Sequence, residues 1–99
     1  MYMSVFRYRA RAGEEDAVVA LHEDWQRNRR PTAIGFVRGE MLPADDDPRA
    51  FIDVVHFESV EAARIVAQDI AQDAWYHRLV SLCEAEPVFT DCQIAWQAR

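Results

Sequence analysis

The segment 51–57 constrains the fold more than any other part of the sequence. Five of its seven residues are apolar, with Asp53 and His56 as the exceptions. Strands with one face in water alternate apolar and polar side chains, whereas here the apolar residues fall on both sides of an extended segment. We therefore expect a strand that is covered on both faces.

The length of 99 residues leaves room for one domain over residues 1–99. A chain of this size buries only about 60–65% of its unfolded surface, yet 51% of its residues are hydrophobic. This surplus predicts that some apolar surface meets a partner subunit or lines a pocket.

The charges exclude several function classes. The net charge is −6, and all eleven basic residues are Arg, so lysine Schiff-base chemistry is excluded and phosphate neutralisation along a nucleic acid or an anionic membrane is not expected. No apolar run approaches the ~20 residues of a membrane span, and no signal segment opens the chain. We expect a cytoplasmic protein.

The pattern of apolar residues and turn residues predicts six main elements. Their order is strand, helix, strand, strand, helix, strand, which is the split β-α-β-β-α-β arrangement of a ferredoxin-like α+β fold with a four-stranded antiparallel sheet and helices on one face. A second subunit is the simplest cover for the other face. The expected strands are 2–9, 32–42, 51–57 and 88–96, the polar turn 43–48 joins the middle two, and the helices follow Gly13 and Ser59, the second interrupted at 69–73.

This order and one stretch of sequence resemble the antibiotic biosynthesis monooxygenase family of dimeric α+β barrels. The stretch reads FIDVVHFESVEAA over 51–63 and continues as DAWYHRL over 73–79. The resemblance implies a homodimer whose two sheets close a barrel, with a pocket between each sheet and its helices. The family includes cofactor-independent oxygenases that act on phenolic polycycles or quinols, enzymes that degrade haem, and many members of unknown function.

The residues of the haem-degrading branch are mostly missing. That branch has an Asn on the first strand, where this chain has Arg7, and a Trp in the second helix, where this chain has Ala67 or Gln68. Its His, about ten residues further on, falls on His77 or Leu79 depending on the register. Haem degradation is therefore not expected. The Trp and the helical His of the common family pattern are also replaced, at Phe57 and near Val66.

The run Trp75-Tyr76-His77 is the densest polar and aromatic cluster. On a functional interpretation, His77 is the base that takes a phenol or hydroquinone proton, and Trp75 and Tyr76 stack on a flat substrate. On a structural interpretation, Trp75 is core one turn before Leu79, and Tyr76 and His77 face solvent, because adjacent helical positions cannot all face one pocket.

Four other residues are candidates for substrate binding. His56 lines a cavity or the dimer interface, or is a hydrogen-bonded structural histidine. His22 and Trp25 share the apolar side of the first helix, at the core or at a pocket edge. Arg38 binds a carboxylate or phenolate, or pairs with an acidic neighbour. The spacing of His and Cys predicts no metal site, and no motif predicts a cofactor.

We therefore predict a homodimeric, cofactor-free monooxygenase that acts on a small aromatic, polyketide-like or quinol substrate. A non-oxidative cyclase or isomerase on the same fold is the first alternative. A non-catalytic ligand-binding or assembly domain is the second.

Overall fold

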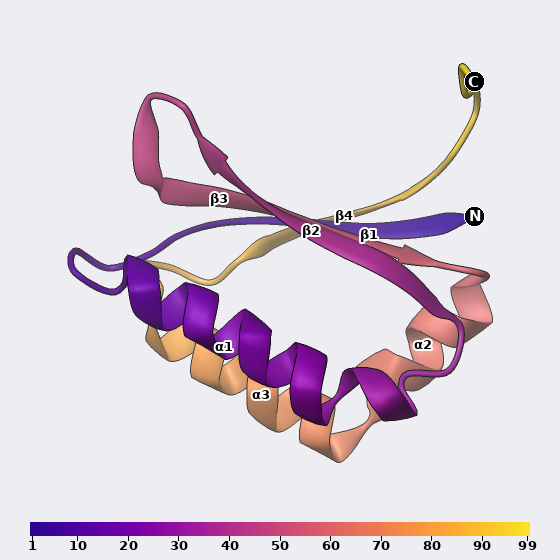
Figure 1. The fold of residues 1–99 in the computed structure, drawn as a ribbon, viewed down its shortest axis with the longest axis horizontal. Coiled ribbons are helices and arrows are strands. Elements are labelled where there is room, and N and C mark those ends of the chain that lie inside the picture. The colour runs from indigo at the N-terminus through magenta and orange to yellow at the C-terminus, as the bar shows by residue number, and fades with distance from the viewer.

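The computed structural model describes all 99 residues. Four antiparallel strands form one sheet in the order β2-β3-β1-β4, and all helices cover the same face of it (Figure 1). The predicted ferredoxin-like α+β fold is confirmed. The elements in chain order are β1 (Tyr2–Arg9), α1 (Glu15–Asn28), a 3-10 turn (Arg30–Thr32), β2 (Phe36–Ala44), β3 (Asp47–Phe57), α2 (Val60–Gln68), α3 (Ile70–Ser81) and β4 (Val88–Gln93).

The helix ends follow from local chemistry. Glu15 and Asp16 lie in the first turn of α1, where the positive end of the helix dipole favours carboxylates. The Ser59 hydroxyl accepts a hydrogen bond from the Ala62 amide at 3.1 Å and so caps α2. Asp69 ends α2 and caps α3 through the Ala71 amide at 2.8 Å, which confirms the predicted interruption. None of the helices has the length and apolarity needed to cross a membrane.

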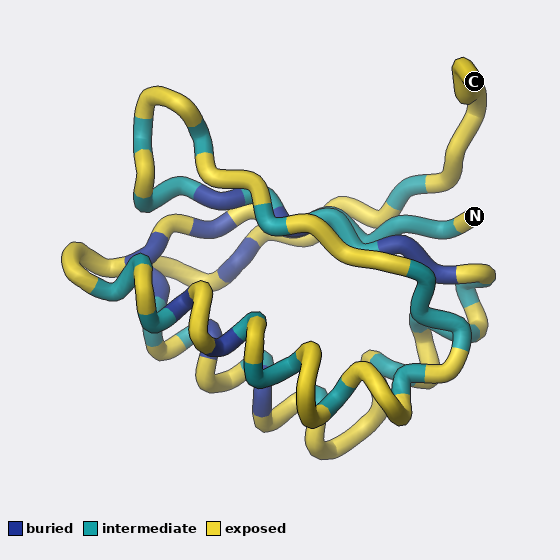
Figure 2. Tube along the Cα trace, in the orientation of Figure 1, coloured by how far each residue is buried: buried dark blue, intermediate teal, exposed yellow.

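Two predicted boundaries around the central hairpin were wrong. The segment before β2 is a 3-10 turn with Pro31 in its first positions, because proline's fixed φ suits a helical first turn, so the strand begins at Phe36 and not at Thr32. The expected acidic loop is only Asp45-Asp46, because Ala44 already pairs with Asp47. The last strand is also shorter than expected, and the chain beyond Gln93 is mostly exposed (Figure 2).

Gly35 sets the approach of α2 to the sheet. Its φ is +85°, and a Cβ built on it would lie 2.5 Å from the Ala62 Cβ on α2. Gly13 has almost the same φ, +83°, but a Cβ there would meet nothing within 4 Å. A side chain at either position would strain the backbone, but only a side chain at Gly35 would also overlap with α2.

We expect Gly35→Ala to lower the free energy of unfolding by about 3 kcal/mol, because it combines left-handed strain with overpacking. Gly13→Ala, the matched control, should lower it by only about 1 kcal/mol. Urea denaturation of both variants measures the difference. Equal losses would show that α2 yields to the added methyl group.

The core lies where the helices meet the sheet. The buried residues lie in the strands and in the helices that cover them (Figure 2). The largest fully buried side chains are those of Leu79, Val18 and Cys83. Both cysteines are free. The core cluster consists of Phe6, Tyr8, Ala10, Val18, Leu21, Phe51, Trp75, Leu79 and Cys83.

The opposite face of the sheet carries no helix (Figure 1). Met3 pairs with His56 and Val5 pairs with Val54 on this face, since these residues alternate with the core residues of β1 and β3. Ile52 and Val54 are only half-buried there. We call this surface the open face. The chain alone therefore does not cover both sides of β3.

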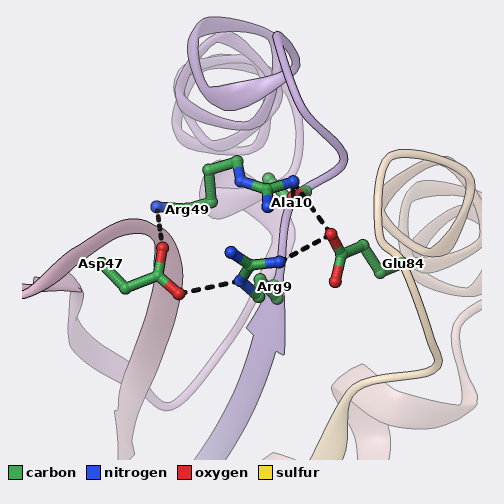
Figure 3. Close-up of polar contacts among 5 residues, drawn as sticks. All are labelled: Arg9, Ala10, Asp47, Arg49 and Glu84. Atoms are coloured by element: carbon green, nitrogen blue, oxygen red, sulfur yellow. Dashed lines mark hydrogen bonds and ion pairs between the residues drawn. The ribbon is translucent and has the colours of Figure 1, made fainter.

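An ion-pair network closes one end of the sheet (Figure 3). Arg9 contacts Asp47 and Glu84, each at 2.8 Å, and Arg49 reaches Glu84 at 2.9 Å. The hydrogen bonds from Arg9 hold the pKa of Asp47 and Glu84 below their usual values. The network joins β1, β3 and Glu84, the third residue after α3, at the end of the molecule remote from α2.

Candidate functional site

A cavity of about 1020 Å³ lies between the sheet and the helices. Side chains from the helix-facing side of every strand line it, together with residues of all three helices. Its volume is at the upper end of the range for small-molecule sites. The lining includes Tyr2, Ser4, Phe6, His22, Trp25, Phe36, Met41, Asp53, Val55, Phe57, Ala63, Trp75, Tyr76 and Phe89.

One buried polar group stands among these apolar walls. Asp53 on β3 is 3% exposed, and its Oδ1 accepts a hydrogen bond from the Tyr8 hydroxyl at 2.9 Å. Its Oδ2 lies 2.5 Å from His22 Nε2. Tyr8 itself is buried on β1, so three elements converge on one carboxylate. We call Tyr8, Asp53 and His22 the polar triad.

The hydrogen-bond partners fix where the protons of the triad lie. His22 Nδ1 is 2.8 Å from the Val18 carbonyl oxygen, which only accepts, so Nδ1 carries a proton. The contact between Nε2 and Asp53 Oδ2 needs one further proton, and we assign it to Nε2, so that an imidazolium faces a carboxylate. His22 then has no free lone pair. The Asp53 oxygens keep unused lone pairs, and Asp53 lines the cavity.

The pKa shifts agree with this arrangement. Burial alone lowers the pKa of His22, but the hydrogen bond and charge of Asp53, with the Val18 carbonyl, outweigh it and raise that pKa above 6.5. Burial and the Asp53 charge raise the pKa of Tyr8 far above its usual value, so Tyr8 stays a hydrogen-bond donor. The triad therefore holds an ionised pair inside an apolar wall.

The titration of His22 predicts how stability depends on pH. A histidine whose folded-state pKa is raised stabilises the fold fully below the unfolded-state pKa, about 6.5, and loses that contribution as the pH rises through the folded-state value. The free energy of unfolding of the parent should therefore exceed that of His22→Gln most at about pH 6 and least at about pH 10. Urea denaturation across this range measures the difference. A constant difference would contradict the ionised pair.

Aromatic side chains hold the triad and shape the walls. The Trp75 ring meets His22 edge-on at 5.3 Å between centroids, and its Nε1 donates to the Leu21 carbonyl oxygen at 2.9 Å. Trp25 lies 4.8 Å from Phe36, and its Nε1 donates to Gln72 at 2.7 Å. Both indole N–H groups are thus satisfied by the protein, which leaves ring surfaces for an aromatic ligand.

Most of the residues predicted from the sequence to bind substrate line this cavity. Trp75, Tyr76, His22 and Trp25 do so from α1 and α3. His77 does not: its side chain is 70% exposed, and its Nδ1 lies 2.9 Å from the Asp73 carbonyl oxygen. The structure therefore places the predicted base outside the cavity.

His56 and Arg38 belong to the other side of the sheet. His56 alternates with the cavity residues Val55 and Phe57, and its Nε2 contacts Glu40 at 2.8 Å. Arg38 borders the cavity from β2, but its guanidinium pairs with Glu40 at 3.1 Å. These two side chains therefore lie on the open face, and His56 is hydrogen-bonded there to Glu40.

Asp53 and Tyr8 were missed as site residues. The signal for Asp53 was its position, because a carboxylate inside an otherwise apolar strand must be paired. Tyr8 gave no such signal, since aromatic residues are common in strands. No group of three or more His, Cys, Asp or Glu residues is placed to hold a metal ion.

Comparisons with known proteins bear on the fold. A candidate antibiotic biosynthesis monooxygenase from Deinococcus radiodurans superposes with a TM-score of 0.82 at 15% identity, covering 100% of this chain and 97% of its own. SnoaB, a cofactor-independent oxygenase from Streptomyces nogalater, gives 0.78 at 15% identity, covering 97% and 94%. A candidate antibiotic biosynthesis monooxygenase from Nitrosomonas europaea gives 0.80 at 13% identity, covering 97% and 100%.

No protein-family model matches the sequence, and no curated protein matches it either. The likeness therefore lies in the backbone, over almost the full length of both chains. The chain has the fold of the antibiotic biosynthesis monooxygenases, as the resemblance over residues 51–63 and 73–79 predicted.

Proposed function

We propose that the protein is a cofactor-independent monooxygenase that acts on a hydroxylated aromatic or quinol substrate. The polar triad in the floor of an aromatic cavity is the observation that carries this proposal. It gives an apolar site one ionised group that can take a proton from a flat substrate.

Asp53 is the proton acceptor in this proposal. A substrate hydroxyl in the cavity donates to an unused lone pair of the carboxylate, and the proton moves to Asp53. The negative charge passes from Asp53 to the substrate oxygen, while the His22 imidazolium beside both stabilises it in either place. Tyr8 fixes the carboxylate through its hydrogen bond to Oδ1.

The substrate anion then supplies the electrons that reduce O2. One electron passes to O2, and the resulting radicals combine to form a carbon–oxygen bond and a peroxide. With an anthrone, loss of water from the peroxide breaks the O–O bond and leaves a quinone. One oxygen atom is thus in the product and the other is in water, and the CH2 group that becomes the carbonyl supplies all four electrons.

Oxygen uptake tests the proposal. The purified protein is incubated with an anthrone or a hydroquinone in an oxygen electrode, with flavins and metals omitted and a chelator present. Uptake of one O2 per quinone formed from the anthrone, above the rate without protein, is the expected result. Rearranged substrate without oxygen uptake would favour the cyclase or isomerase, and binding without any product would favour a ligand-binding domain.

We also propose that a second copy of the chain covers the open face. Val5, Ile52 and Val54 form its central part, and Leu42 and Val88 extend it onto both edge strands with 47% and 65% exposure. An apolar surface across all four strands is typical of an interface. The family that this chain resembles forms dimers in which the two sheets face each other. The fold that the chain shares with the solved structures therefore supports packing of one open face against another.

A further inference from the structure

Most acidic residues that line the cavity form ion pairs, whereas two of its basic residues do not. Among the carboxylates, Asp53 pairs with His22, Glu40 with Arg38 and His56, and Asp73 with His77. The fourth, Asp91, lies on β4 and takes part in none of the ion pairs. Three of the four carboxylates are therefore already paired with cations of the chain.

Two of the cavity's cations lack such partners. Arg30 and Arg64 take part in none of the nine ion pairs of the chain, which run from Arg9–Asp47 to Arg78–Asp24. Both line the cavity from the helix side, Arg30 just after α1 and Arg64 within α2. Their charge remains available to a ligand in a protein whose net charge is −6.

Both cations lie at the same end of the cavity. The Arg30 guanidinium lies over the Phe36 ring at 5.2 Å. Arg64 lies on α2, which follows β3 directly and packs through Ala62 against Gly35 at the start of β2, and its charge also acts on the Tyr2 hydroxyl. Phe36 and Tyr2 both pair with Phe57, from opposite sides. Both arginines therefore lie near the row formed by Phe36, Phe57 and Tyr2, which spans about 10 Å between its outer strands.

The polar triad lies further along the same strand. Asp53 is four residues from Phe57 on β3, which corresponds to about 13 Å in an extended chain. Aromatic and apolar side chains line the space between, including Val55, Trp25 and Trp75. A ligand that used both ends would therefore be longer than a single benzene ring.

We propose that the cavity binds an elongated aromatic carboxylate, with its acid group between Arg30 and Arg64 and its reacting hydroxyl at Asp53. This inference rests on the proposed function for the hydroxyl end only. At the acid end, guanidinium groups match the planar geometry of a carboxylate and form charge-assisted hydrogen bonds with it.

Binding of two matched probes tests the anion site without any turnover. An anthraquinone carboxylate and the corresponding carboxamide have the same ring system and differ in charge, and their binding is followed by quenching of tryptophan fluorescence. The carboxylate should bind about tenfold more tightly. Added salt should weaken the binding of the carboxylate and leave that of the carboxamide nearly unchanged.

Variants assign the preference to the two arginines. Arg30→Gln and Arg64→Gln should each reduce the preference for the carboxylate about threefold, and the double variant should abolish it. Arg11→Gln is the matched control, since Arg11 is exposed, unpaired and outside the cavity. Equal binding of the two probes, no binding of either, or a preference that survives in the double variant would overturn the proposal.

The outcome separates this inference from the proposed function. A carboxylate preference lost in the double variant, together with no oxygen uptake from any hydroxylated aromatic, would retain the anion site and reject the oxygenase. Oxygen uptake together with equal binding of the two probes would retain the oxygenase and reject the anion site.

Discussion

Asp53→Asn is expected to lower the rate of oxygen uptake about 10²–10⁴-fold, the usual contribution of a positioned acid or base. The amide keeps the size of the side chain and can still accept the Tyr8 hydroxyl, but it cannot take a proton. The loss should therefore appear in kcat, with KM nearly unchanged.

A titration of His22 by NMR gives a second readout of the same variant. The hydrogen bond and charge of Asp53 raise the pKa of His22, so this pKa should fall when the carboxylate is removed. Since the amide preserves the shape of the side chain, a folded protein with a lower His22 pKa and low activity would assign the loss to the missing charge.

His77→Asn is the matched control for this experiment. His77 is exposed and does not line the cavity, so its removal should change the rate by no more than about twofold. Activity in Asp53→Asn above about a tenth of the parent rate would contradict Asp53 as the proton acceptor. A loss in His77→Asn equal to that in Asp53→Asn would return the base to His77.

Val54→Arg is expected to convert the protein from a dimer to a monomer. Val54 lies near the centre of the open face, opposite Val5 on β1, so a second sheet packed there would bury the added charge without a partner. Such burial costs several kcal/mol, enough to weaken association about 1,000-fold or more. Sedimentation equilibrium at micromolar concentration should give twice the chain mass of 11.5 kDa for the parent and the chain mass for the variant.

Val19→Arg is the control for the dimer. Val19 lies on α1 with 38% exposure and does not line the cavity, so this variant should remain dimeric. Cys92 gives an independent measurement, because it lies on the open face opposite Met3 and should react faster with a thiol reagent in Val54→Arg. Parent protein that sediments as a monomer at micromolar concentration would contradict the interface.

The sequence predicted the fold but only some of the residues that line the cavity. The period of the apolar residues decides which segments are strands and which are helices, so the order of elements could be predicted. The start of β2 could not, because it follows Gly35, whose close approach to Ala62 depends on the packing of α2. The side of the sheet that His56 faces likewise depends on the register between β1 and β3.

His77 illustrates why only some of the cavity residues could be predicted. Trp75, Tyr76 and His77 are adjacent in the sequence, but successive helical residues point in different directions, and only the first two reach the cavity. The residues that do form the triad come from positions 8, 22 and 53, on two strands and one helix. No local pattern connects them.

By itself, the sequence determined the α+β class, the six main elements in order and a central strand too apolar for one covered face. These follow from local preferences and from the alternation of side chains, which act over a few residues. The tertiary structure alone decided that Asp53 meets Tyr8 and His22, that Arg30 and Arg64 flank the same end of one cavity, and that the apolar surplus of β3 lies on an open face. These depend on register and on the packing of helices against the sheet, which bring together side chains that are distant in the chain.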